Sequence, residues 1–319
     1  MLTLAKILLS MNIIKSVLLN RNSILVLAVI IGLTLGDYAI YVRDYNVYIL
    51  AITMTFSLTG LDLRLINSIK KVVKPFAMGI VLNYFLFGAV LLPVAWLLMP
   101  TNELFYGFVV IVAAPPGVAI IPFSYILKGR VDYAIIGVTG AFVASVFIAP
   151  FLVETLAKAE GVEALAIFIT MVKLVIIPLV IGQLLRHKII YPFIFAVRGK
   201  VVDIGFALII FVAVGINRQV FFTNPTLLLL VITTLAIGIF GLGIAHQLVL
   251  KRLGVSQPNI VTQNMLATIK SSGFSVFTAL SIFGKEAAIP SAVLAVMVLL
   301  YLIFLSLKLN GKTPRKTLK

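Results

Sequence analysis

The sequence predicts an all-α integral membrane protein with ten transmembrane helices, arranged as two inverted five-helix repeats. Three observations lead to this fold class: an apolar composition, ten long apolar runs, and two similar interrupted runs half a chain apart. Of the 319 residues, 62% are hydrophobic and 11% are charged. Soluble globular domains are about half apolar and about a quarter charged. A chain with so few charges cannot cover a water-facing surface, so its helices are expected to lie in a bilayer.

A membrane-spanning helix needs about 20 mostly apolar residues, and we find ten such runs, two of them short or interrupted. They cover residues 24–42, 46–61, 75–99, 104–128, 132–154, 164–186, 201–217, 226–250, 257–283 and 286–307. The first five form one expected repeat, 24–154, and the last five form the other, 164–307. Residues 1–23 are apolar but broken by three cations, which predicts a retained interfacial helix rather than a cleaved signal peptide. Residues 308–319 form a basic tail.

The positive charges test this count, because Lys and Arg concentrate in cytoplasmic loops. With ten spans, twenty of the 26 Lys and Arg residues fall on the side of the N-terminus. Four fall on the other side, and two more, Lys173 and Lys270, lie within runs. Both termini are therefore expected to be cytoplasmic, in the cell (inner) membrane. On this topology Arg198 lies in a cytoplasmic loop, and Asp203 begins and caps the seventh run.

The composition also excludes several functions. The net charge of +16 is spread over short loops rather than gathered in one patch, so no nucleic-acid partner is expected. The chain has no cysteine, which excludes disulfides, thiolate metal sites and a cysteine nucleophile. Two histidines are too few for a histidine metal site. We therefore expect no metal and no cofactor, and membrane lipid as the surrounding partner.

Runs four and nine are interrupted in a similar way. Run four carries Pro115, Pro116 and Gly117 near its middle, and run nine carries Ser271, Ser272 and Gly273. Gly273 follows Gly117 by 156 residues, and a second glycine pair, Gly129 and Gly284, is offset by 155. Because each half has five spans, the second copy must be inverted in the bilayer. Inverted repeats with a discontinuous helix in each half are typical of secondary transporters.

The chain resembles the bile acid:sodium symporter family over nearly its whole length. The resemblance is carried by the ten-span pattern and by the interrupted segments "VVIVAAPPGVAIIPF" and "NMLATIKSSGFSV". Further matching segments are "TFSLTGLDLRL", "LLPVAWLL" and "MVKLVIIPLVIGQLLRHK". The resemblance implies a panel domain of helices 1, 2, 6 and 7 that moves against a core domain of helices 3–5 and 8–10. It also implies transport of a small organic anion and two sodium ions behind the crossing of helices 4 and 9.

The chain departs from the family's pattern at the positions that usually bind sodium. The usual Ser-Asn pair of helix 4 is replaced by two isoleucines, the helix 5 hydroxyls by Ala and Val, and the helix 9 glutamate by Leu. These positions are Ile120, Ile121, Ala134, Val138 and Leu266. Lys270 stands where a sodium-ligating glutamine is usual, so its ammonium can supply the charge that sodium supplies in relatives. Since a buried lysine releases its proton more readily than an exposed one, a proton is a candidate coupling ion.

The sequence therefore predicts a secondary active transporter of a small organic anion, independent of sodium, with Lys270 in place of a sodium ion. Its candidate substrate-binding residues are Pro115, Pro116, Gly117, Thr268, Ser271, Ser272, Gly273 and Asn83. Three alternatives stay open at this point: a sodium-coupled organic anion symporter, a channel or non-transporting sensor, and a Lys270 that only neutralises backbone carbonyls. A Ser-Lys hydrolase is disfavoured because neighbouring helix residues point about 100° apart, and no enzyme activity is expected.

Overall fold

The computed structural model describes residues 21–61, 69–157, 165, 168–169 and 172–310. Over these residues the regular secondary structure is helical, with one short extended contact between Pro116 and Lys270. The expected interfacial helix at 1–23 lies outside the described residues except for its last three, which belong to the first helix. The expected basic tail at 308–319 lies outside them except for 308–310, which end the last helix.

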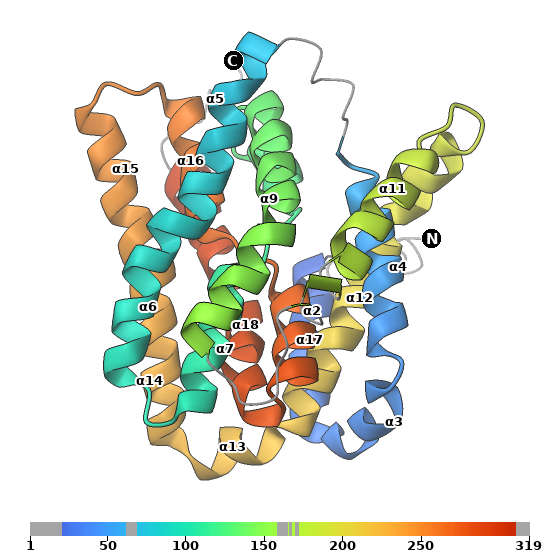
Figure 1. Ribbon diagram of the computed structural model, residues 1–319, viewed down its shortest axis with the longest axis vertical. Helices are drawn as coiled ribbons and strands as arrows, with labels where there is room; N and C mark the ends of the chain where they lie inside the picture. Colours follow the sequence, from blue (N-terminus) through green and yellow to red (C-terminus); the bar gives the residue numbers. More distant parts are fainter. Residues whose placement is uncertain (1–20, 62–68, 158–164, 166–167, 170–171, 311–319) are drawn as a thin grey trace, which may run out of the picture.

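The helices follow the apolar runs along the chain, and Figure 1 shows how they are arranged in space. The first half contains α2 (Arg21–Thr34), η1 (Gly36–Tyr38), α3 (Ala39–Arg43), α4 (Asn46–Leu58), α5 (Ile69–Ile80), η3 (Val81–Leu86), α6 (Phe87–Leu98), α7 (Asn102–Ala113), α8 (Ile120–Ile126) and α9 (Val131–Ala157). The second half contains η4 (Val172–Ile176), α11 (Ile177–Leu184), α12 (Tyr191–Ile216), α13 (Arg218–Thr223), α14 (Pro225–Ala236), η5 (Ile237–Gly241), α15 (Leu242–Arg252), α16 (Gln257–Thr268), α17 (Ser272–Ile282) and α18 (Lys285–Asn310).

Five helical stretches within the described residues are long and apolar enough to cross a membrane. They are Val72–Leu98, Val131–Ala157, Tyr191–Ile216, Pro225–Arg252 and Lys285–Lys308. The first run bends by 94° between Ser23–Thr34 and Gly36–Arg43. If this bent pair of helices is counted as one span, the number of spans rises to six. The other predicted runs are represented by shorter apolar helices, in part because runs four and nine are broken. The chain is a multi-pass membrane protein, and the full count of ten spans stays a prediction.

The seventh run begins earlier than the sequence indicated. It was expected at 201–217, but α12 starts at Tyr191 with a proline in its first turn, where the missing N–H costs nothing. As a result, Arg198 lies inside the helix rather than in a cytoplasmic loop, and Asp203 lies in mid-helix rather than at an N-cap. The charged residues had suggested a loop, whereas α12 extends beyond the apolar stretch.

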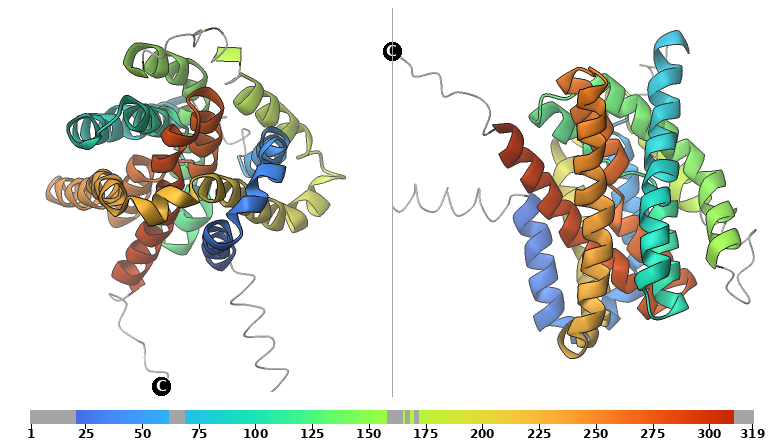
Figure 2. Two further views of the ribbon diagram at one scale, coloured as in Figure 1. Left: turned by 90° about the horizontal axis from the view of Figure 1, so that it is seen from below. Right: turned by 90° about the vertical axis from the view of Figure 1, so that its left-hand side faces the viewer.

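The helices form two groups, which Figures 1 and 2 show side by side. Helix α12 packs against α2, α3 and α4, and α11 packs against α4. The other group contains α5 against α9, α7 against α9 and α18, and α15 against α16. The groups meet mainly where α12 contacts α17 and α18 and where α4 contacts α17. The second broken helix therefore lies at the junction between the groups.

Two segments far apart in the sequence have the same succession of helical types. An α-helix, a π-helix and an α-helix follow each other in α5–η3–α6 and again in α14–η5–α15. Helix α14 begins and ends 156 residues after α5, and η5 begins 156 residues after η3. This offset equals the spacing of Gly117 and Gly273 in the sequence. A π-turn inserts one extra residue into a helix and is rare, so its presence at matching positions is a structural similarity between the halves.

The α5–α9 pair shows how closely these helices approach. A Cβ added at Gly79 would lie 2.1 Å from the carbonyl oxygen of Gly137, and one added at Gly140 would lie 2.7 Å from that of Phe76. Small residues allow such backbone contact between helices in a membrane. The neighbouring η3 is attached to α9 as well, because the Tyr84 hydroxyl donates a hydrogen bond to the Ala141 carbonyl at 2.7 Å. The α5–η3 segment is therefore held rigidly on α9.

A substitution at Gly79 tests this packing. Gly79→Val should lower the free energy of unfolding by about 1–3 kcal/mol, because a side chain forced into a packed interface displaces backbone. Thermal unfolding in detergent should show a clear fall in melting temperature. Gly241→Ala is the matched control, since the nearest atoms to its added Cβ lie 3.9 Å away. Equal melting temperatures for the two variants would contradict the close α5–α9 contact.

Candidate functional site

The first helix break follows directly from two prolines. Helix α7 starts at an N-cap, Thr101, and ends at Ala113, after which the chain runs extended through Pro115 and Pro116 before α8 begins at Ile120. Proline has no backbone N–H, so Pro116 cannot donate the hydrogen bond that the Val112 carbonyl, four residues earlier, would receive in a continuous helix. The break therefore leaves a carbonyl without its helical partner inside the protein.

The second helix break lies directly against the first. Helix α16 ends at Thr268, residues 269–271 are extended, and α17 begins at Ser272 with Ser271 at the N-cap. The two extended segments pair in antiparallel fashion through two backbone hydrogen bonds. The Gly117 N–H donates to the Ile269 carbonyl and the Ser271 N–H donates to the Pro115 carbonyl, both at 3.0 Å. The interruptions predicted in runs four and nine thus meet at one crossing and satisfy part of each other's backbone.

Lys270 lies at this crossing and is 2% exposed. Its Nζ donates one hydrogen bond to the Val112 carbonyl at 2.9 Å and another to the Asn83 carbonyl at 3.1 Å. Both acceptors have lost their usual partners. Pro116 removes the donor for Val112, and in η3 the Phe87 N–H is donated to Leu82 and Tyr84 instead of to Asn83. The ammonium group therefore pairs the two carbonyls that the proline break and the π-helix leave free.

Aromatic rings complete the surroundings of this ammonium. Nζ lies 4.8 Å from the centre of the Tyr84 ring and 5.4 Å from that of Phe87. Within the part of the chain that the structure describes, no carboxylate forms an ion pair with Lys270. Carbonyl dipoles and ring faces both attract cations, and each is worth more when water is excluded. Two backbone carbonyls and two ring faces thus surround the Lys270 ammonium.

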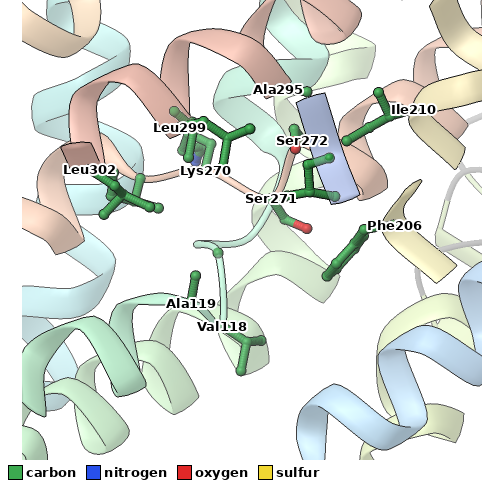
Figure 3. A pocket seen from close by; sticks show the side chains of 14 residues that line it. Val118, Ala119, Phe206, Ile210, Lys270, Ser271, Ser272, Ala295, Leu299 and Leu302 are labelled. Atoms are coloured by element: carbon green, nitrogen blue, oxygen red, sulfur yellow. The ribbon is translucent and has the colours of Figure 1, made fainter. Parts of the chain in front are cut away.

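A small cavity of about 40 Å³ lies beside the crossing, and Figure 3 shows the side chains around it. Gly117, Lys270, Ser271 and Ser272 contribute to its wall from the two extended segments. The remaining wall is apolar and comes from α2, α12, α18 and the apolar residues Val118, Ala119 and Ile269 of the two breaks. Ser271 is 5% exposed, and its hydroxyl makes no hydrogen bond to the described residues. This space is large enough for water or one small polar group, but not for an organic molecule.

A second cavity of about 430 Å³ adjoins the small one, since Val118 and Ala119 line both. It lies among the end of α4, helix α8 and helix α12. Its polar lining consists of Ser57, Arg198 and Asp203, and the rest is glycine and apolar side chains. Ligand pockets for small molecules span roughly 300–1,000 Å³ and are mostly apolar with few polar groups. Sequence reasoning missed these three residues because it assigned the two charges to a loop and a helix end.

The predicted substrate-binding residues divide into two sets in the structure. Gly117, Ser271 and Ser272 line the small cavity, as does Lys270. Five others line neither cavity: Pro115, Pro116, Thr268, Gly273 and Asn83.

Those five positions are occupied with packing and backbone contacts. The Thr268 hydroxyl donates to the Asn264 carbonyl at 2.8 Å, within its own helix, and the Asn83 amide donates to the Ala114 carbonyl at 3.4 Å. A Cβ at Gly273 would lie 2.5 Å from the Phe206 ring, so this glycine lets α17 approach α12. The contacts of these residues are structural in this conformation.

The positions expected to have lost sodium ligands are buried in the apolar core. Ile120, Ile121, Ala134, Val138 and Leu266 all belong to one hydrophobic cluster. The Leu266 side chain reaches α9, where a Cβ on Gly137 would lie 2.8 Å from it. None of these side chains offers an oxygen, and among the described residues no three His, Cys, Asp or Glu side chains gather as a metal site.

Two hydroxyl groups on α8 and α9, the helices that carry four of these positions, make no hydrogen bond to the described residues. They are Ser124 Oγ on α8 and Tyr133 Oη on α9, both buried. Helix α8 carries Ile120 and Ile121, and helix α9 carries Ala134 and Val138. The two helices pack against each other.

Comparison with known proteins gives one family match. The family model of the sodium bile acid symporters matches residues 47–224, which is more than half of the chain. The matched region includes the first break and α12, and it ends before the second break with Lys270. No curated protein matches the chain significantly.

Removal of the Lys270 ammonium tests its role at the crossing. Lys270→Met keeps the length of the side chain but leaves the Val112 and Asn83 carbonyls unpaired, and each unsatisfied buried group costs about 1–3 kcal/mol. We expect a fall of about 2 kcal/mol or more in the free energy of unfolding, visible in thermal melts. Lys251→Met, at an exposed position near the end of α15, is the control and should leave stability unchanged. A Lys270→Met protein as stable as the wild type would show that the two bonds contribute nothing.

Proposed function

Because the chain belongs to the sodium bile acid symporter family, we propose that it transports a small organic anion by alternating access. Members of the family are membrane transporters and not enzymes. The observation that carries the proposal is the crossing of two interrupted helices beside a cavity of about 430 Å³ between two helix groups. Non-helical backbone in a membrane protein is tolerated where it is buried or lines a cavity, and broken helices are where transporters bind substrate.

The proposed mechanism divides the molecule into the two helix groups described above. The group of α2, α3, α4, α11 and α12 is the panel domain, and the rest forms the core domain with the crossing. Each half supplies helices to both domains, in two five-helix repeats of opposite orientation. The offset of 156 residues from α5 to α14, and from the start of η3 to the start of η5, supports this repeat. Movement of the panel past α17 and α8 would open the cavity first on one side of the membrane and then on the other.

The orientation in the membrane is also proposed. With ten spans in the inner membrane, both termini are cytoplasmic, and the cavity lined by Arg198 opens to the cytoplasm. The bias of Lys and Arg toward one side supports this topology.

Reporter fusions test the topology directly. A fusion after Lys319 and a fusion in the segment between α12 and α14 should report opposite sides, the first cytoplasmic and the second external. A green fluorescent protein that is fluorescent only in the cytoplasm and an alkaline phosphatase that is active only outside give complementary readouts. An external reporter after Lys319 would contradict both the ten-span count and the orientation.

We further propose that transport does not require sodium. The five apolar positions around Ile120 and Leu266 offer no ligand, and Lys270 supplies a covalent cation to two freed carbonyls. The proton is the proposed coupling ion, because the amine can gain or lose a charge at this point. Sodium-coupled symport is the second candidate, and it is favoured by the family's description and by the unpartnered hydroxyls of Ser124 and Tyr133.

Ion replacement separates these two candidates. In proteoliposomes, uptake of cholate or a smaller carboxylate should be equal in sodium and choline media of the same ionic strength, and an inward proton gradient should increase it. The proton response should disappear in Lys270→Gln. A sodium-specific gain in uptake or in melting temperature would contradict sodium independence. If it appears, its loss in Ser124→Ala and Tyr133→Phe would identify the hydroxyl ligands.

A gain-of-function variant complements this test. Replacing Ile120 by Ser, Ile121 by Asn, Leu266 by Glu and Lys270 by Gln restores the oxygen-bearing side chains that the family usually has. The combined variant should show a sodium-dependent rise in melting temperature. Lys270→Gln alone should not, because one amide oxygen does not replace a full set of ligands.

A further inference from the structure

We propose that Arg198 binds the anionic group of the transported molecule, in the cavity of about 430 Å³ among α4, α8 and α12. The inference rests on the proposed transport function and adds where and how the substrate's charge is recognised. The lining adds that, within the organic anions proposed above, one with a single charged end and an apolar body fits this cavity.

The guanidinium of Arg198 is held in the cavity wall rather than in open solvent. Arg198 is half-buried on α12, and its Nη1 and Nη2 lie 3.1 and 3.4 Å from the place that a Cβ on Gly60 would occupy. The absence of a side chain at Gly60 thus makes room for the guanidinium at the end of α4. Its Cζ also lies 5.4 Å from the centre of the Phe195 ring. These contacts fix the side chain without using its hydrogen-bond donors.

Those donors are free to take an anion. Among the described residues, no carboxylate forms an ion pair with Arg198. Asp203, the acidic residue in the lining, already has an interaction partner. Ser57, a residue that is 6% exposed, lies in the same wall, and its hydroxyl makes no hydrogen bond to the described residues. A planar guanidinium matches a carboxylate or sulfonate with two parallel hydrogen bonds, and the hydroxyl can add a third.

Capping of α4 is not the role of Arg198, because other residues already do this. The Gln183 amide donates to the Leu61 carbonyl at 2.9 Å and to the Leu58 carbonyl at 3.4 Å. Arg186 donates to the Thr59 carbonyl at 2.6 Å. The carbonyls at and just after the end of α4 are therefore paired by Gln183 of α11 and by Arg186, which follows α11. An arginine kept half-buried beside an end that is already capped has its positive charge available to a ligand.

The apolar residues in the rest of the cavity lining indicate the chemical character of the uncharged part of the ligand. Val118, Ala119, Pro122, Phe123 and Ile126 form an apolar wall on the side of the first break and α8. A hydrophilic dianion would leave its second charge facing these side chains without a partner. A monoanion with an apolar body buries that body here while its charged end pairs with Arg198.

The absence of cysteine in the sequence makes a local binding test possible. A single cysteine is introduced by Phe123→Cys, with Ile126→Cys as a second site in case the first variant folds poorly. Its labelling rate with a neutral thiol reagent is measured in detergent. The probes are cholate below its micelle concentration and a series of shorter alkyl and aryl carboxylates, each compared with its uncharged primary amide.

At least one carboxylate should slow the labelling in the protein with native Arg198, and its amide should not. In Arg198→Gln, about tenfold or more carboxylate should be needed for equal protection, since a lost charged partner weakens binding by at least that factor. Arg198→Lys, which keeps the charge but not the planar pair of donors, should give intermediate protection. Two variants are matched controls: Arg186→Gln, which removes a bond at the end of α4, and Lys200→Gln, which changes an exposed residue of α12, the helix of Arg198. In both, the carboxylate should protect the cysteine as it does in the wild type.

The outcomes separate this inference from the proposed function. If no carboxylate protects the cysteine in the native background, organic anion transport through this cavity is contradicted, and the role of Arg198 with it. If a carboxylate protects equally well in Arg198→Gln, or its amide protects equally well, the cavity binds the molecule but Arg198 does not recognise its charge. A third outcome would overturn the proposal in favour of a lipid headgroup. In that case phosphatidylglycerol nanodiscs protect the cysteine only when Arg198 is present, whereas carboxylates protect it equally well in Arg198→Gln.

Discussion

The crossing of the two broken helices depends on the hydrogen bonds that the Lys270 ammonium donates to two backbone carbonyls. Proline at position 116 ends α7 and removes a backbone donor, and the π-helix η3 frees a second carbonyl nearby. Both free carbonyls are buried, where an unpaired acceptor is costly. A single side chain from the other half of the chain satisfies both. The proline break after α7, the π-helix η3 and the lysine between α16 and α17 therefore depend on one another, because the lysine pairs the carbonyls that the other two leave free.

In the proposed mechanism, this arrangement lets the chain do without oxygen-bearing side chains behind the crossing. A bound cation would need several ligands with hard oxygen atoms, and it would leave whenever the site opened. A covalently attached ammonium needs only the carbonyls and the ring faces that lie around it. The neighbouring positions are then free to be apolar, and Ile120, Val138 and Leu266 accordingly pack into the core. A lysine at the crossing and apolar side chains at the usual sodium positions are therefore consistent with each other in the proposed mechanism.

The two cavities have different chemical characters. The small one beside the crossing carries backbone and hydroxyl groups, and its volume of about 40 Å³ admits only a small group. The larger one carries a guanidinium and an extensive apolar wall. Because Val118 and Ala119 line both, a molecule bound at Arg198 lies next to the segment that follows Gly117. Binding of substrate and the position of the first broken helix are thus coupled by direct contact in the proposed mechanism.

The sequence by itself determined the membrane class and the positions of the two helix breaks, and it singled out Lys270 as an unusual residue at the second break. These features depend on local chemistry: hydrophobic runs, proline without an N–H, and a cation in an apolar segment. The family was also accessible from segments such as those around Gly117 and Gly182, because its motifs are local in sequence.

Only the tertiary structure decided what these features contact. The free carbonyl of Asn83 arises from a π-turn, which no residue pattern announces, and it lies 187 residues from the lysine that pairs it. Arg198 and Asp203 were assigned to a loop and a helix end because charge was taken to mark the boundary, although α12 continues through both. Thr268 and Asn83, predicted from the sequence to bind substrate, bond to backbone in this conformation, and their contact with substrate stays a prediction. Whether a polar side chain faces a cavity or a carbonyl depends on the packing of distant helices, and this information is not contained in any single segment.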